Sequence, residues 1–401
     1  MRTYRSRFLS VLLIFLLVAP LQAQNLRDPR FMELSKAGFA DMYNLDYEKA
    51  RQAFALLEKE YPDHPAPPLY TASIYWLEEM LRRQDAALNR FLVPAYFWQE
   101  TKHVMPPRDR EAFFQGLNKS EALANAILEK NRSDKDSRYF LATAYGLRAS
   151  FAVTVDHSLR EAFSTGKKAY SLTKKLIEED PNYHDARLTV GVYEYIAGNI
   201  PWVIKWITFF VGVRGNKEQG FAHLKTASEK GQYIKNEAEL VLMVFCVRER
   251  RYGEALEIAR SLHSRFPRNF LFAVNVAQIL KLAGKKDQAA AKFIEVERRV
   301  EAGEPNFNKL PLPLFRFNVG TELLHMEKLD LAFERFRKCI ENPQTPEREQ
   351  ALSHLSLGKI LFWSGRKGEA VKECESVLAL RDFDESHNQA RDLLRRMKES
   401  K

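Results

Sequence analysis

LSKAGFADMYNLDYEKARQAFALLEKEYP, residues 34–62, decides the fold of this chain. Gly38 stands within a helical pattern, where a residue without a side chain lets a second helix approach closely. Ala50 follows twelve residues later and Phe54 four residues after that, so both share one face of the second helix. Pro62 ends the unit because proline cannot continue a helix. The stretch therefore predicts two antiparallel helices that meet at a small residue and an aromatic ring.

The same interval returns further along the chain. Gly320 and Ala332 are twelve residues apart, and so are the later glycine and alanine at 358 and 370. Ala255 and Ala289 are separated by 34 residues, which is the length of one helix-pair repeat of this type. Each coincidence is weak by itself, but the set predicts a stacked array, because one helix pair cannot bury its apolar face alone.

Over nearly all of its mature length the chain resembles the tetratricopeptide repeat superfamily. The resemblance implies an all-α, right-handed superhelical α-solenoid, a fold in which neighbouring helix pairs share one continuous core. We expect about eight helix pairs and a C-terminal capping helix at 389–398, where Leu393, Leu394 and Met397 share a face. The first helices of the pairs are expected near residues 31–43, 68–83, 137–150, 185–198, 237–250, 271–284, 315–328 and 351–364.

The N-terminal residues 1–23 are typical of a secretory signal peptide. A basic segment, an apolar run at 8–18 and the small residue Ala23 follow one another. Cleavage there is expected, and an uncleaved N-terminal anchor is the alternative. We therefore expect an exported protein that is periplasmic, envelope-associated or secreted. The mature chain is divided into tetratricopeptide-like repeats at 24–300, a proline-containing connection at 301–314, and a C-terminal repeat pair with its capping helix at 315–401.

Two further stretches depart from the repeat. Residues 84–118 are rich in aromatic side chains and predict an irregular or lengthened helix pair. An aromatic insert at 200–213 lies between a glycine-bearing helix ending in VGVYEY, residues 190–195, and the segment RGNKEQG, residues 214–220. This order of elements resembles the central region of the eukaryotic inclusion-body clearance family (tetratricopeptide repeat protein 39). The similarity covers this stretch alone, so it implies only the fold.

Charge and cysteine usage restrict the function classes. The formal net charge is +10, and loss of the signal residues Arg2, Arg5 and Arg7 lowers it to +7. A balance this modest, without a dense Lys/Arg run, does not predict nucleic-acid binding. The three cysteines, at 246, 339 and 374, lack metal-ligand spacing and are expected to be buried. A disulfide between Cys339 and Cys374 remains an open alternative in an oxidising compartment.

No local motif for catalysis is present. The sequence has no HExxH, no Gly-x-Ser-x-Gly and no phosphate-binding glycine loop. The histidines are scattered. His184 and Asp185 adjoin in the turn before a helix, where Asp185 is expected to cap the helix, and His263 and His325 have no obvious partner. We therefore expect no enzyme activity, no cofactor and no metal site.

The leading hypothesis is an exported scaffold that binds a protein or peptide partner through the concave groove of the solenoid. We expect it to serve assembly or maintenance of another envelope component. Aromatic side chains would anchor the partner, and the cations would hold carboxylates. The alternative for several of these side chains is packing between repeats. The groove residues expected from the repeat register are Phe39, Tyr43, Tyr70, Tyr139, Tyr195, Arg248, Gln278, Lys281, Phe317, Lys359, Phe362 and Trp363.

The alternative hypothesis is a peripheral membrane protein that uses the insert at 200–213. The insert is too short to span a bilayer upright, but its aromatic residues Trp202, Trp206, Phe209 and Phe210 could enter a membrane interface. Burial of the same side chains in the solenoid's own core is the favoured interpretation. The sequence leaves the identity of the partner and the oligomeric state open.

Overall fold

A computed structural model describes residues 28–83, 104–199, 215–232 and 234–399. All regular secondary structure within these residues is helical, which confirms the all-α prediction for them. The chain forms two compact units, residues 1–275 and residues 276–401.

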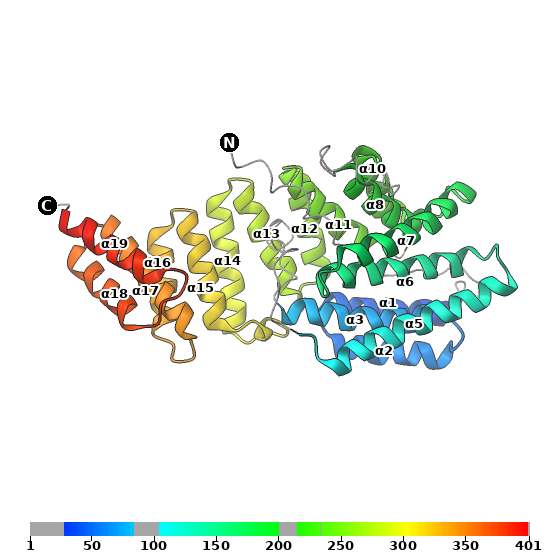
Figure 1. Cartoon of the computed structure of the whole chain (residues 1–401), viewed down its shortest axis with the longest axis horizontal. Coiled ribbons are helices and arrows are strands. Elements are labelled where there is room, and N and C mark those ends of the chain that lie inside the picture. The colour runs from blue at the N-terminus through cyan, green and yellow to red at the C-terminus, as the bar shows by residue number, and fades with distance from the viewer. Residues whose placement is uncertain (1–27, 84–103, 200–214, 233, 400–401) are drawn as a thin grey trace. The chain divides into compact units, whose positions relative to one another are not determined.

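In the N-terminal unit each helix packs antiparallel on its neighbours along the chain (Figure 1). A short 3-10 turn, η2 (His184–Ala186), leads into the helix at 187. The helices are α1 (Pro29–Tyr43), α2 (Tyr47–Glu60), α3 (Ala66–Arg82), α5 (Pro107–Lys130), α6 (Lys135–Thr154), α7 (Leu159–Glu179), α8 (Arg187–Gly198), α10 (Lys217–Lys230), α11 (Lys235–Arg248) and α12 (Tyr252–Arg265).

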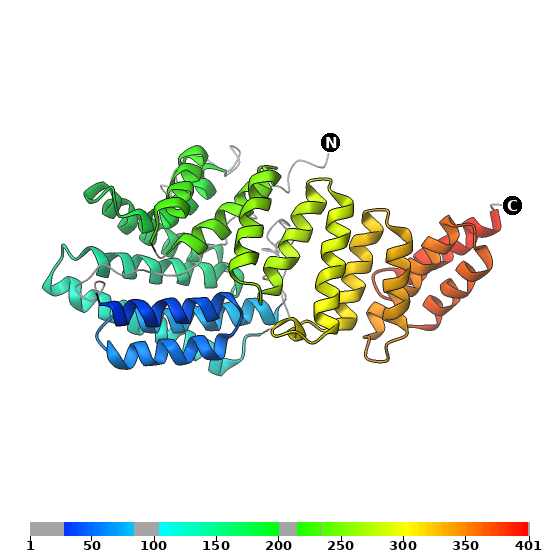
Figure 2. The same cartoon turned by 180° about the vertical axis from the view of Figure 1, so that it is seen from behind.

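The C-terminal unit repeats the same hairpin arrangement, which Figure 2 shows from the opposite side. The unit boundary falls within α13 (Phe270–Leu282). The 3-10 turn η3 (Phe307–Lys309) lies in the proline-containing connection. The remaining helices are α14 (Lys286–Glu301), α15 (Leu312–His325), α16 (Leu329–Ile340), α17 (Glu347–Trp363), α18 (Lys367–Ala379) and α19 (Ser386–Glu399).

Each expected first helix coincides with a helix of the structure, namely α1, α3, α6, α8, α11, α13, α15 and α17. Within the irregular stretch 84–118, residues from Pro107 onwards belong to α5, which is 24 residues long. The preceding residues 84–103 lie outside the described part. The expected capping helix is α19, whose Leu393 and Met397 are buried against α17 and α18, with Leu394 partly buried beside them.

The glycine contact expected from residues 34–62 is present. Ala50 and Phe54 are fully buried, and a Cβ added at Gly38 would clash with the ring of Phe54. The same device recurs in the C-terminal unit, where a Cβ at Gly320 would lie 3.0 Å from the ring of Phe336. The glycine is thus needed for close helix approach, which is the basis of the tetratricopeptide-like packing.

A second recurring feature is the turn that joins the two helices of a pair. In five pairs, one turn residue has a positive φ between 59° and 75°, a conformation that favours glycine. In each case this residue stands five positions before the small alanine of the second helix. The residues are Leu45, Arg250, Gly284, Glu327 and Gly365. Only two of the five are glycine, so this turn could not be found from residue types.

The N-terminal unit also contains a contact between residues far apart in the sequence. The turn after α1 meets the turn that precedes α13. Asn269 Nδ2 donates to the carbonyl oxygen of Tyr43 at 2.7 Å, and the backbone N–H of Arg268 donates to Asn44 Oδ1 at 3.1 Å. Arg268 also forms an ion pair with Asp46. These bonds hold the first hairpin of the N-terminal unit against the turn that precedes α13.

All three cysteines are buried and free. Burial raises the pKa of Cys246 and of Cys374 to about 11, so both are protonated thiols at neutral pH. Cys374 packs under α17, where its Sγ would lie 3.3 Å from a Cβ at Gly358. The cysteines therefore act as small core residues, and the Cys339–Cys374 disulfide is not formed in the structure.

Candidate functional site

The four tyrosines expected to line the groove all lie in the N-terminal unit, and all four are buried. Tyr70, Tyr139 and Tyr195 are at most 2% exposed, and Tyr43 is 9% exposed. Burial raises the pKa of Tyr139 and Tyr195 above the ordinary tyrosine value. Their side chains are therefore part of the core, and they present almost no surface to a partner.

These buried rings bridge neighbouring elements of the solenoid. Tyr70 of α3 packs on Phe39 of α1 with ring centroids 4.7 Å apart. Tyr195 of α8 stacks on Phe245 of α11 at 3.8 Å. The ring centroid of Tyr139 lies 5.4 Å from that of Tyr183, which precedes η2. The ring centroids of Tyr43 and Phe266 are 4.9 Å apart. These four tyrosines therefore pack between elements of the solenoid, which was the alternative to their lining a groove.

Among the cations expected to hold carboxylates, Arg248 and Lys281 have different environments. Arg248 is half-buried beside Tyr195, and among the described residues no carboxylate forms an ion pair with it. Lys281 of α13 forms an ion pair with Glu322 of α15, and Gln278 Nε2 donates to the same carboxylate at 3.1 Å. Lys281 and Gln278 are therefore already engaged by a neighbouring first helix.

The third cation, Lys359, lies in α17 four residues before Trp363, so both side chains emerge from one face of that helix. Lys359 Nζ donates to Gln389 Oε1 of α19 at 2.9 Å, and burial lowers its pKa. Trp363 is 59% exposed, whereas its neighbour Phe362 packs partly against the core beneath α18 and α19. We name Lys359, Phe362 and Trp363 the α17 face.

The position of Trp363 follows from how its helix ends. Gly365 has a φ of 75° and turns the chain towards α18, so α17 ends at Trp363. A Cβ at Gly365 would meet no atom within 4 Å, so the turn itself is open to solvent. Trp363 is therefore the last residue of α17, next to an open turn, and its side chain stays 59% exposed.

Phe317 is the remaining aromatic residue expected in the groove. It lies in α15, half-buried, with its ring centroid 6.0 Å from that of Phe336 in the same hairpin. Helices α15 and α17 contact each other directly. The structure thus places Gln278, Lys281 and Phe317 on α13 and α15, and the α17 face on the next first helix.

The insert residues Trp202, Trp206, Phe209 and Phe210 lie outside the described part of the chain. The helices that flank the insert are described, and they pack at very short range. A Cβ at Gly220 of α10 would lie 2.8 Å from the carbonyl oxygen of Gly191 in α8. The glycines that flank the insert in the sequence are therefore explained by close packing of α8 on α10.

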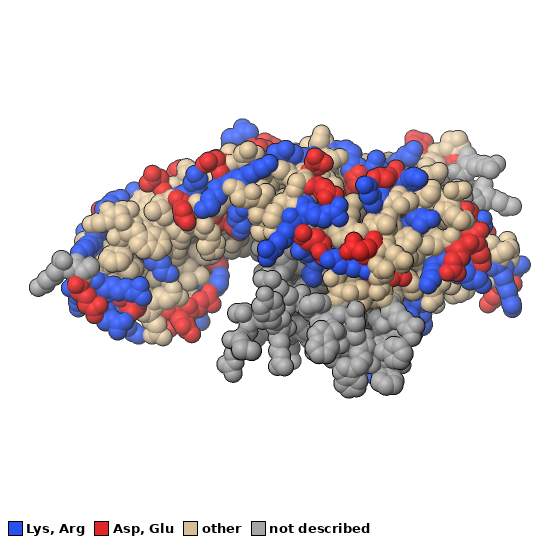
Figure 3. Space-filling model, turned by 90° about the horizontal axis from the view of Figure 1, so that it is seen from above, with Lys and Arg blue, Asp and Glu red and all other residues tan. Residues whose placement is uncertain are grey.

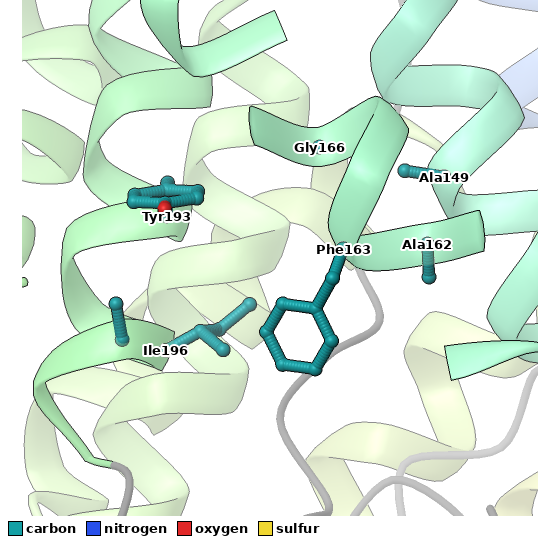
Figure 4. A pocket seen from close by; sticks show the side chains of 7 residues that line it. Ala149, Ala162, Phe163, Gly166, Tyr193 and Ile196 are labelled. Atoms are coloured by element: carbon teal, nitrogen blue, oxygen red, sulfur yellow. The ribbon is translucent and has the colours of Figure 1, made fainter. Parts of the chain in front are cut away.

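An apolar hollow lies between α6, α7 and α8 (Figure 4). The side chains of Phe163, Tyr193 and Ile196 border it, together with Ala149, Ala162, Gly166 and Ala197. Its cavity volume of about 20 Å³ is room for roughly one water molecule. The hollow is therefore too small for a substrate or cofactor, and its lining offers almost no polar group to hold one.

The structure also pairs two side chains of the C-terminal unit that the sequence did not indicate as partners. His354 Nδ1 of α17 lies 2.6 Å from Glu373 Oε2 of α18. The two residues are nineteen positions apart, so only the packing of the hairpin brings them together. Within the described residues, no group of three or more His, Cys, Asp or Glu side chains is placed to hold a metal ion.

Basic and acidic side chains stand next to one another over the face drawn in Figure 3. Such interspersion is typical of a solvated protein surface. None of the helices in the described part of the chain combines the length and the apolar character needed to cross a membrane.

In comparisons with known proteins, no family model and no curated protein sequence matches the chain. Solved structures do match. A tetratricopeptide repeat protein from Parabacteroides merdae ATCC 43184 is 16% identical, with 82% of this chain and 99% of that chain covered and a TM-score of 0.30. Yeast Tom70 is 14% identical, with 93% and 90% covered and a TM-score of 0.32.

Human IFIT1, in the structure of its dimer with m7Gppp-AAAA, is also 14% identical to this chain. The match covers 98% of this chain and 91% of that chain, with a TM-score of 0.41. Identities and TM-scores this low transfer no partner and no activity. The fold assignment rests on the helices, glycine contacts and turns described above.

Proposed function

We propose that this protein is a non-enzymatic, exported scaffold that binds a protein or peptide partner through the α17 face. The observation that carries the proposal is the 59% exposure of Trp363. Three other large hydrophobic residues of the described part are exposed, namely Val104 at 79%, Leu56 at 38% and Leu282 at 36%, and none of them is aromatic. Tryptophan is enriched among the residues that contribute most to protein interfaces, because it buries a large rigid area at low entropic cost.

The chemistry of the α17 face indicates what such a partner presents. Trp363 offers an apolar ring to an aliphatic or aromatic side chain. Lys359 lies one helical turn away and is bonded to an amide oxygen rather than to a carboxylate. A carboxylate of the partner can therefore pair with Lys359 while its apolar neighbour packs on Trp363. Both groups stand on a helix, which limits the entropy lost on binding.

Export and an envelope role belong to the same proposal and are supported by the signal-like residues 1–23. From the resemblance of the central region to the inclusion-body clearance family we propose a shared fold and no shared cellular role. Membrane association through 200–213 remains the alternative function and concerns residues outside the described part of the chain.

A photo-crosslinking amino acid at position 363 tests the proposal in intact cells. The expected result is one discrete crosslinked adduct, identified by mass spectrometry, that disappears when Lys359→Glu is added. The matched control is the same amino acid at position 56, because Leu56 is also exposed (38%) but lies in α2 of the N-terminal unit. No adduct is expected from position 56.

Lys372→Glu supplies a second control, because Lys372 is exposed on α18. It makes the same charge change outside the α17 face and should leave the adduct intact. Equal crosslinking from positions 363 and 56, or loss of the adduct in Lys372→Glu as well as in Lys359→Glu, would show that the α17 face is not a specific binding surface.

A further inference from the structure

One exposed face of α7 in the N-terminal unit carries a continuous row of cations. Arg160, Lys167 and Lys174 are spaced seven residues apart, and Lys168 and Lys175 form a parallel row with the same spacing. Residues seven apart on an α-helix lie on nearly the same face, about 10.5 Å from one another. All five side chains are exposed. We name these five residues the α7 stripe.

The stripe concentrates charge that is otherwise dispersed. Residues 160–175 contain five cations and one carboxylate, Glu161, which gives a formal charge of +4. The whole chain of 401 residues carries +10. The next carboxylates on α7 are Glu178 and Glu179, and Lys175 forms an ion pair with Glu179, with Nζ 3.8 Å from Oε1. Like charges this close repel one another, and an anionic partner would relieve that repulsion.

Aromatic rings, not carboxylates, lie beneath two of the lysines. Lys168 Nζ lies 5.4 Å from the ring centroid of Tyr145 in α6, and Lys174 Nζ lies 5.5 Å from that of Tyr170. The nearest buried carboxylate on α8, Glu194, is already bonded by Tyr170 Oη at 2.5 Å and by the backbone N–H of Asn216 at 2.6 Å. The charges of Lys168 and Lys174 therefore remain available to a partner.

We propose that the α7 stripe docks an acidic helical segment of a partner protein. A helix with carboxylates seven residues apart presents them with the same spacing of about 10.5 Å as the cations of the stripe. An interface of this kind is dominated by electrostatic complementarity, so it associates quickly and weakens as salt screens the charges.

Two other anionic partners fit the stripe less well. The exposed large hydrophobic residues of the described part, Leu56, Val104, Leu282 and Trp363, all lie outside α7, so the described residues of this helix offer no strongly exposed apolar side chain to a membrane. Single-stranded nucleic acid stacks its bases on open aromatic faces. One face of Tyr170 is covered by Lys174, and its ring stacks on Tyr193 at 4.0 Å.

Fluorescence anisotropy with two labelled peptides tests the proposal on the mature chain. One peptide is helical with Glu at heptad spacing on one face, and the other has the same composition with Glu scattered around the helix. We expect the heptad peptide to bind at least about tenfold tighter than the scattered one. Its affinity should fall at least about tenfold between about 50 mM and about 300 mM salt.

Charge reversal then assigns the binding to α7. Lys168→Glu with Lys174→Glu should weaken binding of the heptad peptide by about tenfold or more. The matched control, Lys49→Glu with Lys59→Glu, makes the same charge change on exposed positions of α2 and should change the affinity less than about twofold. Trp363→Ala should also leave this binding unchanged, which separates the α7 stripe from the α17 face.

Three outcomes would overturn the proposal. Equal affinity for the two peptides would mean that the spacing of the stripe is not recognised. Equal loss in the α2 and α7 variants would mean that only net charge attracts the peptide. Tighter binding to vesicles with about 30% anionic lipid than to the heptad peptide, abolished by the α7 variant, would make the stripe a membrane surface. Circular dichroism of each variant should show the wild-type helical signal.

Discussion

The first helices of the two units use the same repeat register but place their aromatic side chains in different environments. Tyr195, in α8 of the N-terminal unit, is fully buried and stacks on Phe245 of the next first helix. Trp363, in α17 of the C-terminal unit, is 59% exposed. The elements that lie opposite a first-helix side chain therefore decide whether that side chain is buried or exposed.

The residues opposite differ in kind between the units. Aromatic rings connect successive first helices in the N-terminal unit, as in the pair of Tyr70 and Phe39. In the C-terminal unit a polar bridge connects two first helices, where Lys281 meets Glu322, and another connects the last first helix to the capping helix, where Lys359 meets Gln389. Rings that stack exclude solvent from the space between helices, whereas an ion pair stays partly hydrated. This difference accompanies the exposure of Trp363 on the C-terminal unit.

The largest difference between the two units is expected in the free energies of unfolding of the variants Tyr195→Ala and Trp363→Ala. Loss of the buried ring should lower the free energy of unfolding by about 3–5 kcal/mol, through lost apolar burial and a residual cavity. Loss of the exposed ring should change it by less than about 0.5 kcal/mol. Urea denaturation followed by circular dichroism measures both. Equal destabilisation by the two variants would remove the distinction between the units.

The N-terminal unit should also respond to pH through Asp136. Burial raises the pKa of Asp136 to about 7, with Tyr183 Oη donating to its carboxylate at 2.8 Å. The folded state therefore binds this proton more tightly than the unfolded state does. The associated stability is fully present below pH 3.8 and is lost as the pH rises to about 7.

Asp136→Asn should abolish that dependence and make the protein more stable than wild type at pH 8, by at most about 4 kcal/mol. Burial lowers the pKa of His64 to about 4, so His64 opposes the trend between pH 6.5 and pH 4. The difference between wild type and Asp136→Asn cancels the His64 contribution. A difference in unfolding free energy that does not grow between pH 4 and pH 8 would contradict the assignment.

The turn that ends α17 offers a smaller test within the C-terminal unit. Gly365→Ala should destabilise the protein by about 1 kcal/mol, because a side chain is strained at a φ of 75° although the surrounding space is open. Gly368→Ala, three residues later in α18 and equally open, should stabilise it by up to about 1 kcal/mol through helix propensity. Thermal melts of the two variants should shift in opposite directions.

The smallest effect is expected for the polar bridge between α13 and α15. Lys281→Met removes the ion pair with Glu322 while keeping the length of the side chain. The change in unfolding free energy should be less than about 1 kcal/mol, as is usual for partly exposed pairs. A loss comparable with that of Tyr195→Ala would mean that the bridges in the two units contribute equally, contrary to the comparison above. Urea denaturation at low and high salt provides the measurement.

The sequence predicted the fold well because the fold depends on local patterns. The interval from Gly38 to Ala50 and Phe54 anticipated a contact in which the glycine has no room for a Cβ. The first helices were also found close to their observed ranges, since the apolar period of a helix is a property of short segments. The positive-φ turn before the second helix was missed, because in three of the five turns the position is held by a residue other than glycine, namely Leu45, Arg250 or Glu327.

The candidate site was predicted less well, because exposure depends on neighbours from other repeats. Tyr139 and Trp363 were both expected to line the concave groove, yet Tyr139 is buried and Trp363 is exposed. Lys281 and Lys359 were expected to be free for carboxylates, and Lys281 is already paired with Glu322. The local sequence does not indicate these pairings, because they join residues from different helices.

By itself the sequence determined the all-α class, the spacing of the helix pairs and the small residues at their contacts. Only the tertiary structure decided which aromatic side chains are exposed, which cations are paired, and that the turn at Tyr43 and Asn44 meets Arg268 and Asn269. Helix period and close approach are set by covalent neighbours and residue size. Burial and pairing are set by residues that are distant in the chain and become neighbours only when the repeats stack.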